Sequence, residues 1–413
     1  MGTTCPTAGP VPLAPSMEAV PPSADGPPPL TVMTLNVQQY KSFPDDEVAG
    51  ARRLREVTEL QAVPPDVVCV QEGVEDEMDH LGHLCDAFGY SKVQSSAWTR
   101  LPADPSSAIT NQIYVRQGSA WEVVGRGAEV ISSKMLLSHE DFKGKPVYLP
   151  VRTAAWVRLQ PRRRAAAAGP GVVVVTAHLS GGRYEDQAYL QRLAQERRHQ
   201  AERALAIFAR ERGPQDAGIV VGDFNASAEE KADGPTRAYF SRAIWPKGTV
   251  QTDARRFGMS FDAAFQEFSA YMTAPFGAVT EQGWHFAYDE ATVGPTSVYG
   301  HLVDHMAVNS PTALRRTSVQ RLLTCAARSA RSGAGGDKPK GHVSISDHHA
   351  VAATFDTAGL LPDASAYRGG PPAAAGPEAA IAAWAAARAS RRQARELERQ
   401  AAKRSEAQAD AGP

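Results

Sequence analysis

The sequence predicts an α/β protein in which two β-sheets pack face to face and helices cover them. Strand-like and helix-like segments alternate through the middle of the chain, and the order strand, helix, strand occurs twice in units of similar size. Apolar strands must be covered on both faces, which favours a two-sheet sandwich with helices outside. Each half of the chain is expected to contribute its strands to one sheet.

The first unit begins and ends with apolar segments, residues 30–37 (LTVMTLNV) and 66–71 (DVVCVQ), which predict buried strands. Between them, residues 46–63 carry apolar side chains near helical spacing. In the second unit, residues 172–177 (VVVVTA) and 218–221 (GIVV) predict strands on either side of a long helix over residues 185–212.

More strands are expected on both sides of the second unit. A strand pair at residues 121–130 and 153–159 precedes it, and strands at residues 302–309 and 349–355 follow it. The last two are expected to be separated by a long loop that includes RSARSGAGGDKPKGH.

Composition sets the domain boundaries. Residues 1–29 are rich in Pro, Ala, Gly and Ser and predict a disordered leader, because they lack the apolar surface that would offset the entropy of ordering. The domain is expected over residues 30–357. Residues 358–413 predict an Ala/Arg-rich, partly helical tail with only Ile381 and Trp384 as large apolar anchors.

Charge and cysteine usage exclude some classes of protein. The 44 Lys and Arg residues balance 45 Asp and Glu residues, so the chain is not a polycation built to coat nucleic acid, and phosphate binding must be local. Its 4 cysteines form no CxxC pair and no zinc spacing, which fits a reducing compartment. Without a signal-peptide pattern or a run of roughly 18 apolar residues, the sequence favours a soluble intracellular protein, cytoplasmic or nuclear.

Polar residues suited to metal binding and proton transfer stand at the ends of the apolar strands. A single Asn or Asp at a strand end is most often a turn former, but six such sites favour a catalytic cleft. The residues are Asn36, Glu72, His178, Asp223, Asn225, Asp304, Asp347 and His348.

These segments resemble, in order, the motifs of the endonuclease/exonuclease/phosphatase superfamily, which shares the fold of deoxyribonuclease I. The matching segments are LNV at Asn36, VQE at Glu72, TAHL at His178, GDFN at Asp223 and Asn225, VDH at Asp304, and SDHHAV at Asp347 and His348. The resemblance implies a four-layered α/β/β/α sandwich with an active site in a cleft at one end. It also implies a metal-dependent hydrolase of phosphoric esters.

The resemblance assigns a metal-binding role to three residues. Glu72 resembles the principal Mg²⁺ ligand, and Asn36 and Asp347 resemble residues that help to hold the ion or its waters. Such hard oxygen ligands suit Mg²⁺, with Mn²⁺ as the alternative ion.

The remaining residues resemble the catalytic groups. Asp223 and Asn225 resemble the pair that orients the attacking water and binds the phosphate, and His178 resembles a donor to a phosphoryl oxygen. Asp304 resembles the carboxylate that fixes the tautomer of His348. Either Asp223 or His348 could accept the proton from water, and Asp223 is the favoured activator. The neighbouring His349 is expected to be a strand residue that points the other way.

The leading functional prediction is a nuclease-like phosphodiesterase whose phosphoester substrate is a nucleic acid. The alternative is a phosphatase or phospholipase C that acts on inositol phosphates or sphingolipids, and the third reading is a non-enzymatic scaffold. The sequence near Asp304 lacks the Cys-Asp-Arg signature of inositol polyphosphate phosphatases. The basic segment 315–340 is expected to form a loop near the cleft that holds a phosphate backbone, or else a solvated insertion.

Overall fold

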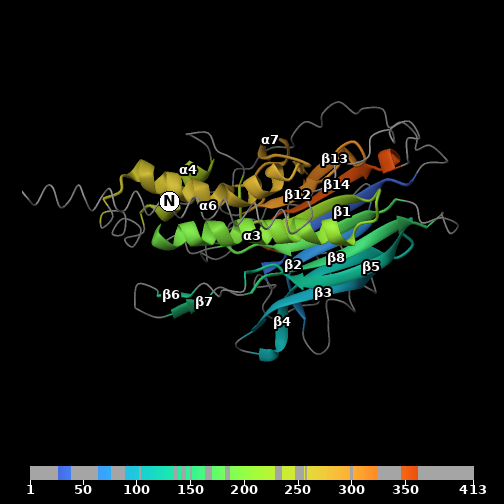
Figure 1. The fold of residues 1–413 in the computed structure, drawn as a ribbon, viewed down its shortest axis with the longest axis horizontal. Helices are drawn as coiled ribbons and strands as arrows, with labels where there is room; N and C mark the ends of the chain where they lie inside the picture. Colours follow the sequence, from blue (N-terminus) through green and yellow to red (C-terminus); the bar gives the residue numbers. More distant parts are fainter. Residues whose placement is uncertain are drawn as a thin grey trace, which may run out of the picture. The chain divides into compact units, whose positions relative to one another are not determined.

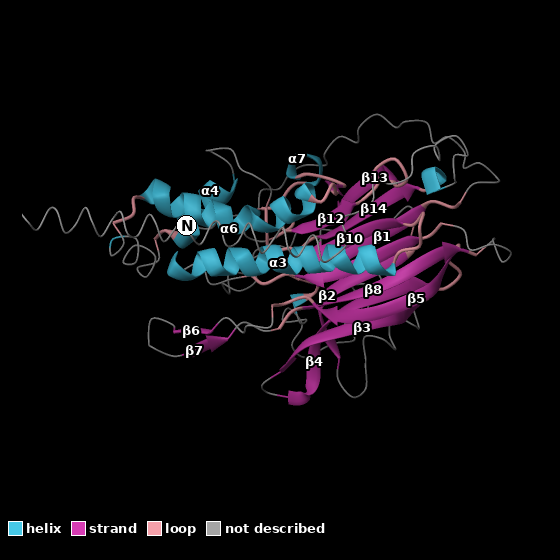
Figure 2. Ribbon diagram, viewed as in Figure 1, coloured by secondary structure: helices cyan, strands magenta, loops and turns pink. Residues whose placement is uncertain are grey.

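Two six-stranded mixed sheets contain twelve of the fourteen strands in the described part of the chain (Figures 1 and 2). The structure is a computed structural model. It describes residues 27–38, 64–75, 89–101, 104–133, 138–140, 146–148, 151–162, 170–181, 187–227, 235–246, 255, 258–297, 301–322 and 346–360. All of these lie in Met1–Leu361, the first of two units into which the chain divides.

The first sheet has the strand order β13-β14-β1-β2-β4-β3. Its strands are β1 (Leu30–Asn36), β2 (Val67–Glu75), β3 (Tyr90–Leu101), β4 (Asp104–Arg116), β13 (Arg315–Leu322) and β14 (Ala350–Asp356).

The second sheet has the order β11-β12-β10-β9-β8-β5. Its strands are β5 (Trp121–Val130), β8 (Thr153–Pro161), β9 (Val172–His178), β10 (Ala217–Asp223), β11 (His285–Phe286) and β12 (Asp304–Val308). A separate hairpin pairs β6 (Ser138–Glu140) with β7 (Pro146–Tyr148).

The described helices are few, and two of them are long. They are α3 (Gln187–Glu211), α4 (Pro235–Tyr239), the π-helix η2 (Phe240–Ile244), α6 (Phe261–Glu281), α7 (Glu290–Val293) and the 3-10 turn η4 (Ala358–Leu360).

Alternation along β9 explains the layering. Val172 and Val174 point into the core between the two sheets, whereas Val173 and Val175 point to the opposite face, where they pack against α3 and α6. Figure 2 shows α3 lying along the sheet region beside α6. The four consecutive valines of β9 are therefore buried on both sides by two different layers.

The predicted sandwich of two sheets with helices outside is confirmed, with one difference in connectivity. The chain returns at its end to the first sheet, where β14 pairs antiparallel with β1 and β13 pairs with β14. The halves of the chain are therefore not confined to one sheet each. The predicted helix over residues 185–212 is α3, and the predicted pair at 121–130 and 153–159 is β5 with β8. The helix expected over residues 46–63 lies outside the described residues.

The expectation that residues 315–340 form one basic loop is wrong for its first part. Residues Arg315–Leu322 form the edge strand β13. Arg315 pairs with Asp356, and the guanidinium groups of Arg316 and Arg321 donate to the carbonyls of Ala287 and Pro295. Arg328, Arg331, Lys338 and Lys340 lie outside the described residues.

Described residues just outside the predicted range of 30–357 also contact the two sheets. The Thr357 hydroxyl donates to the carbonyls of Pro27 and Pro28, and the Trp121 indole donates to the carbonyl of Pro29. Leu360 is buried in the core between the sheets.

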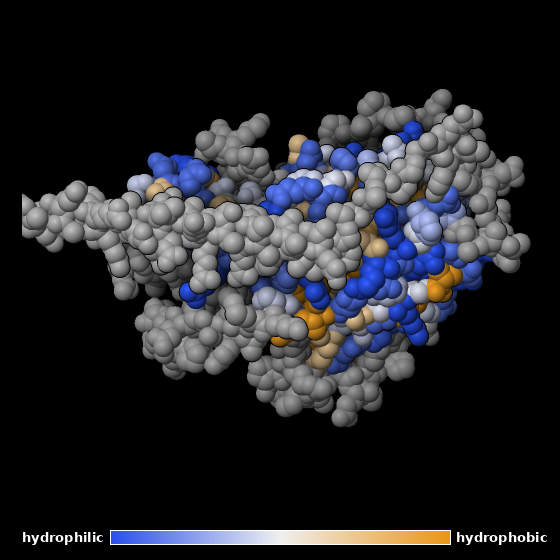
Figure 3. All heavy atoms as spheres, in the orientation of Figure 1, coloured by the Kyte–Doolittle hydropathy of each residue, from blue (hydrophilic) through white to orange (hydrophobic). Residues whose placement is uncertain are grey.

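The surface of the described residues is largely polar. Val124, Val130 and Val151 are the large hydrophobic residues found exposed there, and Figure 3 shows only small apolar patches on the described part of one face. No helix in the described ranges is long and apolar enough to cross a membrane.

Candidate active site

Strand ends from both sheets bring the candidate residues together. In the second sheet, His178 at the end of β9 lies beside Asp223 at the end of β10. Since β12 runs antiparallel to β10, its first residue, Asp304, is the partner of Asp223 on the other side. Asn36, at the end of β1 in the first sheet, reaches this row with an amide nitrogen 2.8 Å from Asp223 Oδ2.

A bulge in β2 determines the direction in which the Glu72 side chain points. The pairing register between β2 and β4 shifts between Val70 and Gly73, and Glu72 has a φ of 54°. A bulge re-aims one side chain, and here it brings Glu72 Oε1 to 3.2 Å from the Asn36 amide nitrogen.

Left-handed backbone conformations gather at this site. Gln38, Glu72 and Asn225 are the non-glycine residues with positive φ in the described parts of the chain. Such conformations are costly for residues with a side chain, so they persist only where the surrounding structure holds them. All three residues contact the candidate site through hydrogen bonds to Asn36, Asp347, Asp223 or His178.

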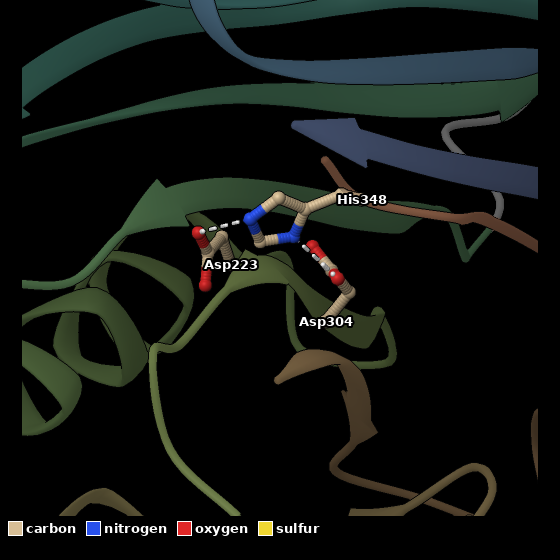
Figure 4. A group of neighbouring side chains, drawn as sticks. All are labelled: Asp223, Asp304 and His348. Atoms are coloured by element: carbon tan, nitrogen blue, oxygen red, sulfur yellow. Dashed lines mark hydrogen bonds and ion pairs between the residues drawn. The ribbon is translucent and has the colours of Figure 1, made fainter. Parts of the chain in front are cut away.

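His348 lies between two buried carboxylates (Figure 4). Its Nδ1 is 2.9 Å from Asp304 Oδ2, and its Nε2 is 3.8 Å from Asp223 Oδ2. Burial by itself would lower the pKa of His348, but the charges of Asp304, Asp223 and Asp347 and the bond to Asp304 outweigh it and raise this pKa well above its usual range. His348 is therefore an imidazolium whose Nε2–H is directed toward Asp223.

Asp223 is held by donors on both of its oxygens. The Asn225 backbone N–H donates to Oδ1 at 2.7 Å, and the Asn36 amide donates to Oδ2. Burial is the main cause that raises the pKa of Asp223, and Asp304 adds to it while His348 opposes it. A carboxyl group with a raised pKa next to an imidazolium can exchange a proton near neutral pH.

His178 is neutral in this environment. Burial, Arg152 and His348 all lower its pKa. Its Nε2 is 2.9 Å from the Asn225 amide nitrogen, and the same amide nitrogen donates to the Leu179 carbonyl at 3.0 Å. Since that nitrogen must be a donor, His178 Nε2 accepts here and its proton is on Nδ1, 3.9 Å from Glu72 Oε1.

Two carboxylates with partly exposed oxygens, Glu72 and Asp347, fit a divalent cation. Their side chains are 17% and 21% exposed. Burial is the main cause that raises the pKa of Asp347, and the charges of Glu72 and Asp304 raise it further. Such an excess of negative charge on hard oxygen atoms is what a divalent cation can compensate. Asn36 presents its amide nitrogen to Glu72, while its oxygen accepts from the Gln38 backbone N–H, so the carboxylates supply the anionic oxygens.

A second group of potential ligand atoms comes from Asp223, Asp304 and His348, which lie within 4.8 Å of one another. A metal ligand must be a deprotonated imidazole, whereas His348 is held protonated and its Nδ1 is bonded to Asp304. These three residues therefore suit proton transfer better than metal binding.

All eight residues predicted from strand ends form one connected network, through the contacts of Asn36, His178 and His348 with the others. His349 is buried, and its backbone N–H donates to the Thr296 carbonyl.

Sequence reasoning missed two residues of the site, Gln38 and Arg152. Gln38 donates to Asp347 Oδ2 at 2.8 Å. Arg152 is buried just before β8, and burial, partly opposed by the charges of Glu72 and Asp223, lowers its pKa to about 10. It therefore remains a cation at neutral pH. The segment PVRTAAW carries no pattern that distinguishes this arginine from the many others in the chain.

Two six-stranded sheets with a cluster of carboxylates, amides and histidines at their strand ends define a hydrolase-type site. The endonuclease/exonuclease/phosphatase family model matches residues 33–348, and the chain belongs to this family. Its members are phosphoester hydrolases that generally use divalent metals, so the chain is a phosphoric ester hydrolase.

Solved structures resemble the chain at low sequence identity. An endonuclease/exonuclease/phosphatase from Bacteroides vulgatus is 14% identical, with 80% of this chain and 99% of that chain covered and a TM-score of 0.46. The human Nocturnin catalytic domain is 14% identical, with 80% and 95% covered and a TM-score of 0.45. A mannosyl-6-phosphatase from Bacteroides thetaiotaomicron is 14% identical, with 79% and 99% covered and a TM-score of 0.45. No curated protein sequence matches the chain significantly.

Proposed function

We propose that the protein is a Mg²⁺-dependent phosphodiesterase of nuclease type. One observation carries the proposal: the carboxylates of Glu72 and Asp347 adjoin the proton-transfer group Asp223, His348 and Asp304. Asp347 Oδ1 is 3.8 Å from His348 Nε2, and the Asn36 amide nitrogen donates to both Glu72 and Asp223. A phosphodiester needs both kinds of group, since its charge must be neutralised and a water must lose a proton.

Glu72 and Asp347, with Asn36 beside them, would hold the ion. When bound, Mg²⁺ supplies Lewis acidity and neutralises charge on the phosphoryl group, and Mn²⁺ can do the same. Gln38 orients Asp347 by donating to its Oδ2.

Asp223 is proposed to accept the proton of the attacking water. Its Oδ1 is fixed by Asn225 and its Oδ2 by Asn36, so the carboxylate cannot rotate freely. His348, kept charged by Asp304, would donate its Nε2 proton to the phosphoryl group and its leaving oxygen. The proton that Asp223 takes from water would then pass to His348, so that both side chains return to their starting states.

Arg152 and Asn225 are proposed to stabilise the developing negative charge. Arg152 is a buried cation whose charge is felt at Glu72 and Asp223. Asn225 uses its amide hydrogens on His178 Nε2 and the Leu179 carbonyl, and a phosphoryl oxygen would replace His178 as acceptor. His178 would then hold the Asn225 amide in place before substrate binds.

Nucleic acid is the proposed substrate class for two reasons. The sequence near Asp304 lacks the Cys-Asp-Arg signature of inositol polyphosphate phosphatases, and segment 315–340 is rich in basic residues. Arg315, Arg316 and Arg321 make intramolecular contacts, so any phosphate contacts of that segment would fall to Arg328, Arg331, Lys338 and Lys340. An intracellular location stays a prediction of the sequence.

The test is hydrolysis of bis(p-nitrophenyl) phosphate, single-stranded and duplex DNA, RNA, phosphoinositides and sphingomyelin in the same Mg²⁺ buffer. Glu72→Gln should lower turnover on the order of 10²-fold or more, because it removes the ligand charge. Glu75→Gln is the matched control, since Glu75 lies on the same strand but pairs with Lys92. Full activity in excess chelator would refute the metal dependence, and turnover confined to lipids would refute the nuclease reading.

A further inference from the structure

Helix α3 carries a fully buried arginine, Arg197, next to the loop that follows β10. Its Nη1 donates to the Tyr271 carbonyl at 2.8 Å, and its Nη2 donates to the carbonyls of Phe224 and Asn225. The guanidinium carbon also lies 4.1 Å from the centroid of the Tyr271 ring. A buried cation that binds three backbone carbonyls of two other segments fixes their relative positions.

A proline in α6 provides one of these carbonyls. Pro275 lies inside α6 and has no N–H, so the carbonyl four residues earlier, that of Tyr271, lacks its usual helical donor. Arg197 supplies the missing donor. The Tyr271 carbonyl therefore has a donor in place of the missing N–H, and α6 in turn anchors the guanidinium of Arg197.

The other two carbonyls belong to the loop that carries Asn225. Asn225 has a φ of 49°, and its side chain lies against Gly181, where a Cβ would come within 2.3 Å of the amide carbon. Because the Phe224 carbonyl points to Arg197, the N–H of the same peptide points the opposite way, to Asp223 Oδ1 at 2.7 Å. One peptide unit thus links Arg197 to Asp223.

A side chain on the next turn of α3 also forms hydrogen bonds to a loop of the site, the one that follows β9. Gln200 is buried, its Oε1 accepts from the Ser180 backbone N–H at 2.8 Å, and its Nε2 donates to the Ser180 hydroxyl. Ser180 follows His178 closely in the chain. Two side chains of α3 therefore hold the loops after β9 and after β10.

We propose that Arg197 is a positioning residue for catalysis, which holds Asn225 in its left-handed conformation and the Asn225 N–H on Asp223. This inference rests on the proposed roles of Asp223 and Asn225. Without the N–H donors of the Arg197 guanidinium, the loop after β10 can relax so that Asn225 leaves its positive φ. Asn225 and Asp223 would then lose their alignment with the reacting phosphate.

The test compares Arg197→Lys and Arg197→Gln with Arg198→Gln as the matched control. Lys keeps the charge but not the guanidinium donors, and Gln keeps two donors but not the charge. Arg198 is the next residue of the helix, but it pairs on the surface with Glu202 and Glu281. Each variant is measured for thermal unfolding, for kcat and KM on bis(p-nitrophenyl) phosphate, and for amide hydrogen exchange over residues 222–227.

We expect Arg197→Lys to remain folded, to lose on the order of 10²-fold in kcat with KM within about threefold, and to exchange faster in residues 222–227. Arg197→Gln should be at least as impaired, and Arg198→Gln should match the wild type. Normal kcat in a destabilised Arg197→Lys variant would reduce Arg197 to a structural role, and normal exchange in residues 222–227 would overturn the proposal. If the wild-type protein does not cleave the diester, or Glu72→Gln leaves activity intact, the proposed function fails, while the exchange data still decide whether Arg197 holds the loop.

Discussion

His348 and His349 are neighbours in the chain, and the ring nitrogens of His348 lie among the carboxylates of the site, whereas His349 is predicted to be a strand residue that points the other way. His348→Ala should therefore lower kcat by on the order of 10²- to 10⁴-fold, because it removes the proton-transfer partner of Asp223. His349→Ala should keep turnover within a few-fold when corrected for folded protein. Steady-state rates and thermal melts of both variants check this. A folded but inactive His349 variant beside an active His348 variant would contradict the assignment.

At the residue scale, the sequence was informative where a polar residue follows an apolar strand, as at His178 and Asp223. Such residues must converge once the strands are neighbours in a sheet. The sequence was not informative for Arg152 and Arg197, which are two arginines among many. They differ from the other arginines in being buried. Burial depends on segments distant in the chain, such as the part of α6 near Pro275 that contacts Arg197.

At the element scale, the strands buried on both faces were predictable because their apolar runs are continuous. The edge strand β13 (RRTSVQRL) was not, since most of its side chains are exposed and polar. The bulge at Glu72 was also beyond prediction, because it depends on the register between β2 and β4. The position of a motif could be predicted, but not the backbone conformation that aims its side chain.

Asp216 joins four elements at the start of β10. It accepts from Arg158 on β8 and from the backbone N–H groups of Gly171 and Gly213, which flank β9 and α3. Burial alone would raise the pKa of Asp216, but these donors outweigh burial and lower it. A lowered folded-state pKa stabilises the fold above the unfolded value, about 3.9, and this contribution is lost as pH falls through the folded value.

Asp216→Asn should therefore reduce the free energy of unfolding at pH 7 by on the order of 2 kcal/mol, with a smaller deficit below about pH 4. Urea unfolding at a series of pH values measures it. Glu281→Gln is the control, because its pair with Arg198 is on the surface and should contribute within about 0.5 kcal/mol. A deficit for Asp216→Asn that stays constant down to pH 3 would show that the charge of Asp216 is not the cause.

At the scale of the whole molecule, composition predicts the domain over residues 30–357, and residues just outside this range make contacts with it. The residues just outside this range do not differ in type from their neighbours in the chain. Only their contacts in the structure relate them to the domain. Pro27 and Pro28 present carbonyls to Thr357, and Leu360 is buried between the sheets. The two ends of the domain are thus held together beside β1 and β14, which are themselves paired.

This arrangement predicts a difference between two truncated forms of the chain. Residues 27–361 should fold with the stability and activity of the full chain. Residues 30–357 should be less stable by on the order of 3 kcal/mol, because this form loses the buried Leu360 side chain and the bonds from Thr357. Thr357→Val in the longer form separates the two contributions, since it removes only the hydroxyl. Denaturant unfolding and turnover on bis(p-nitrophenyl) phosphate check both forms, and equal stability of the two would mean that the contacts of Pro27, Pro28 and Leu360 contribute nothing to folding.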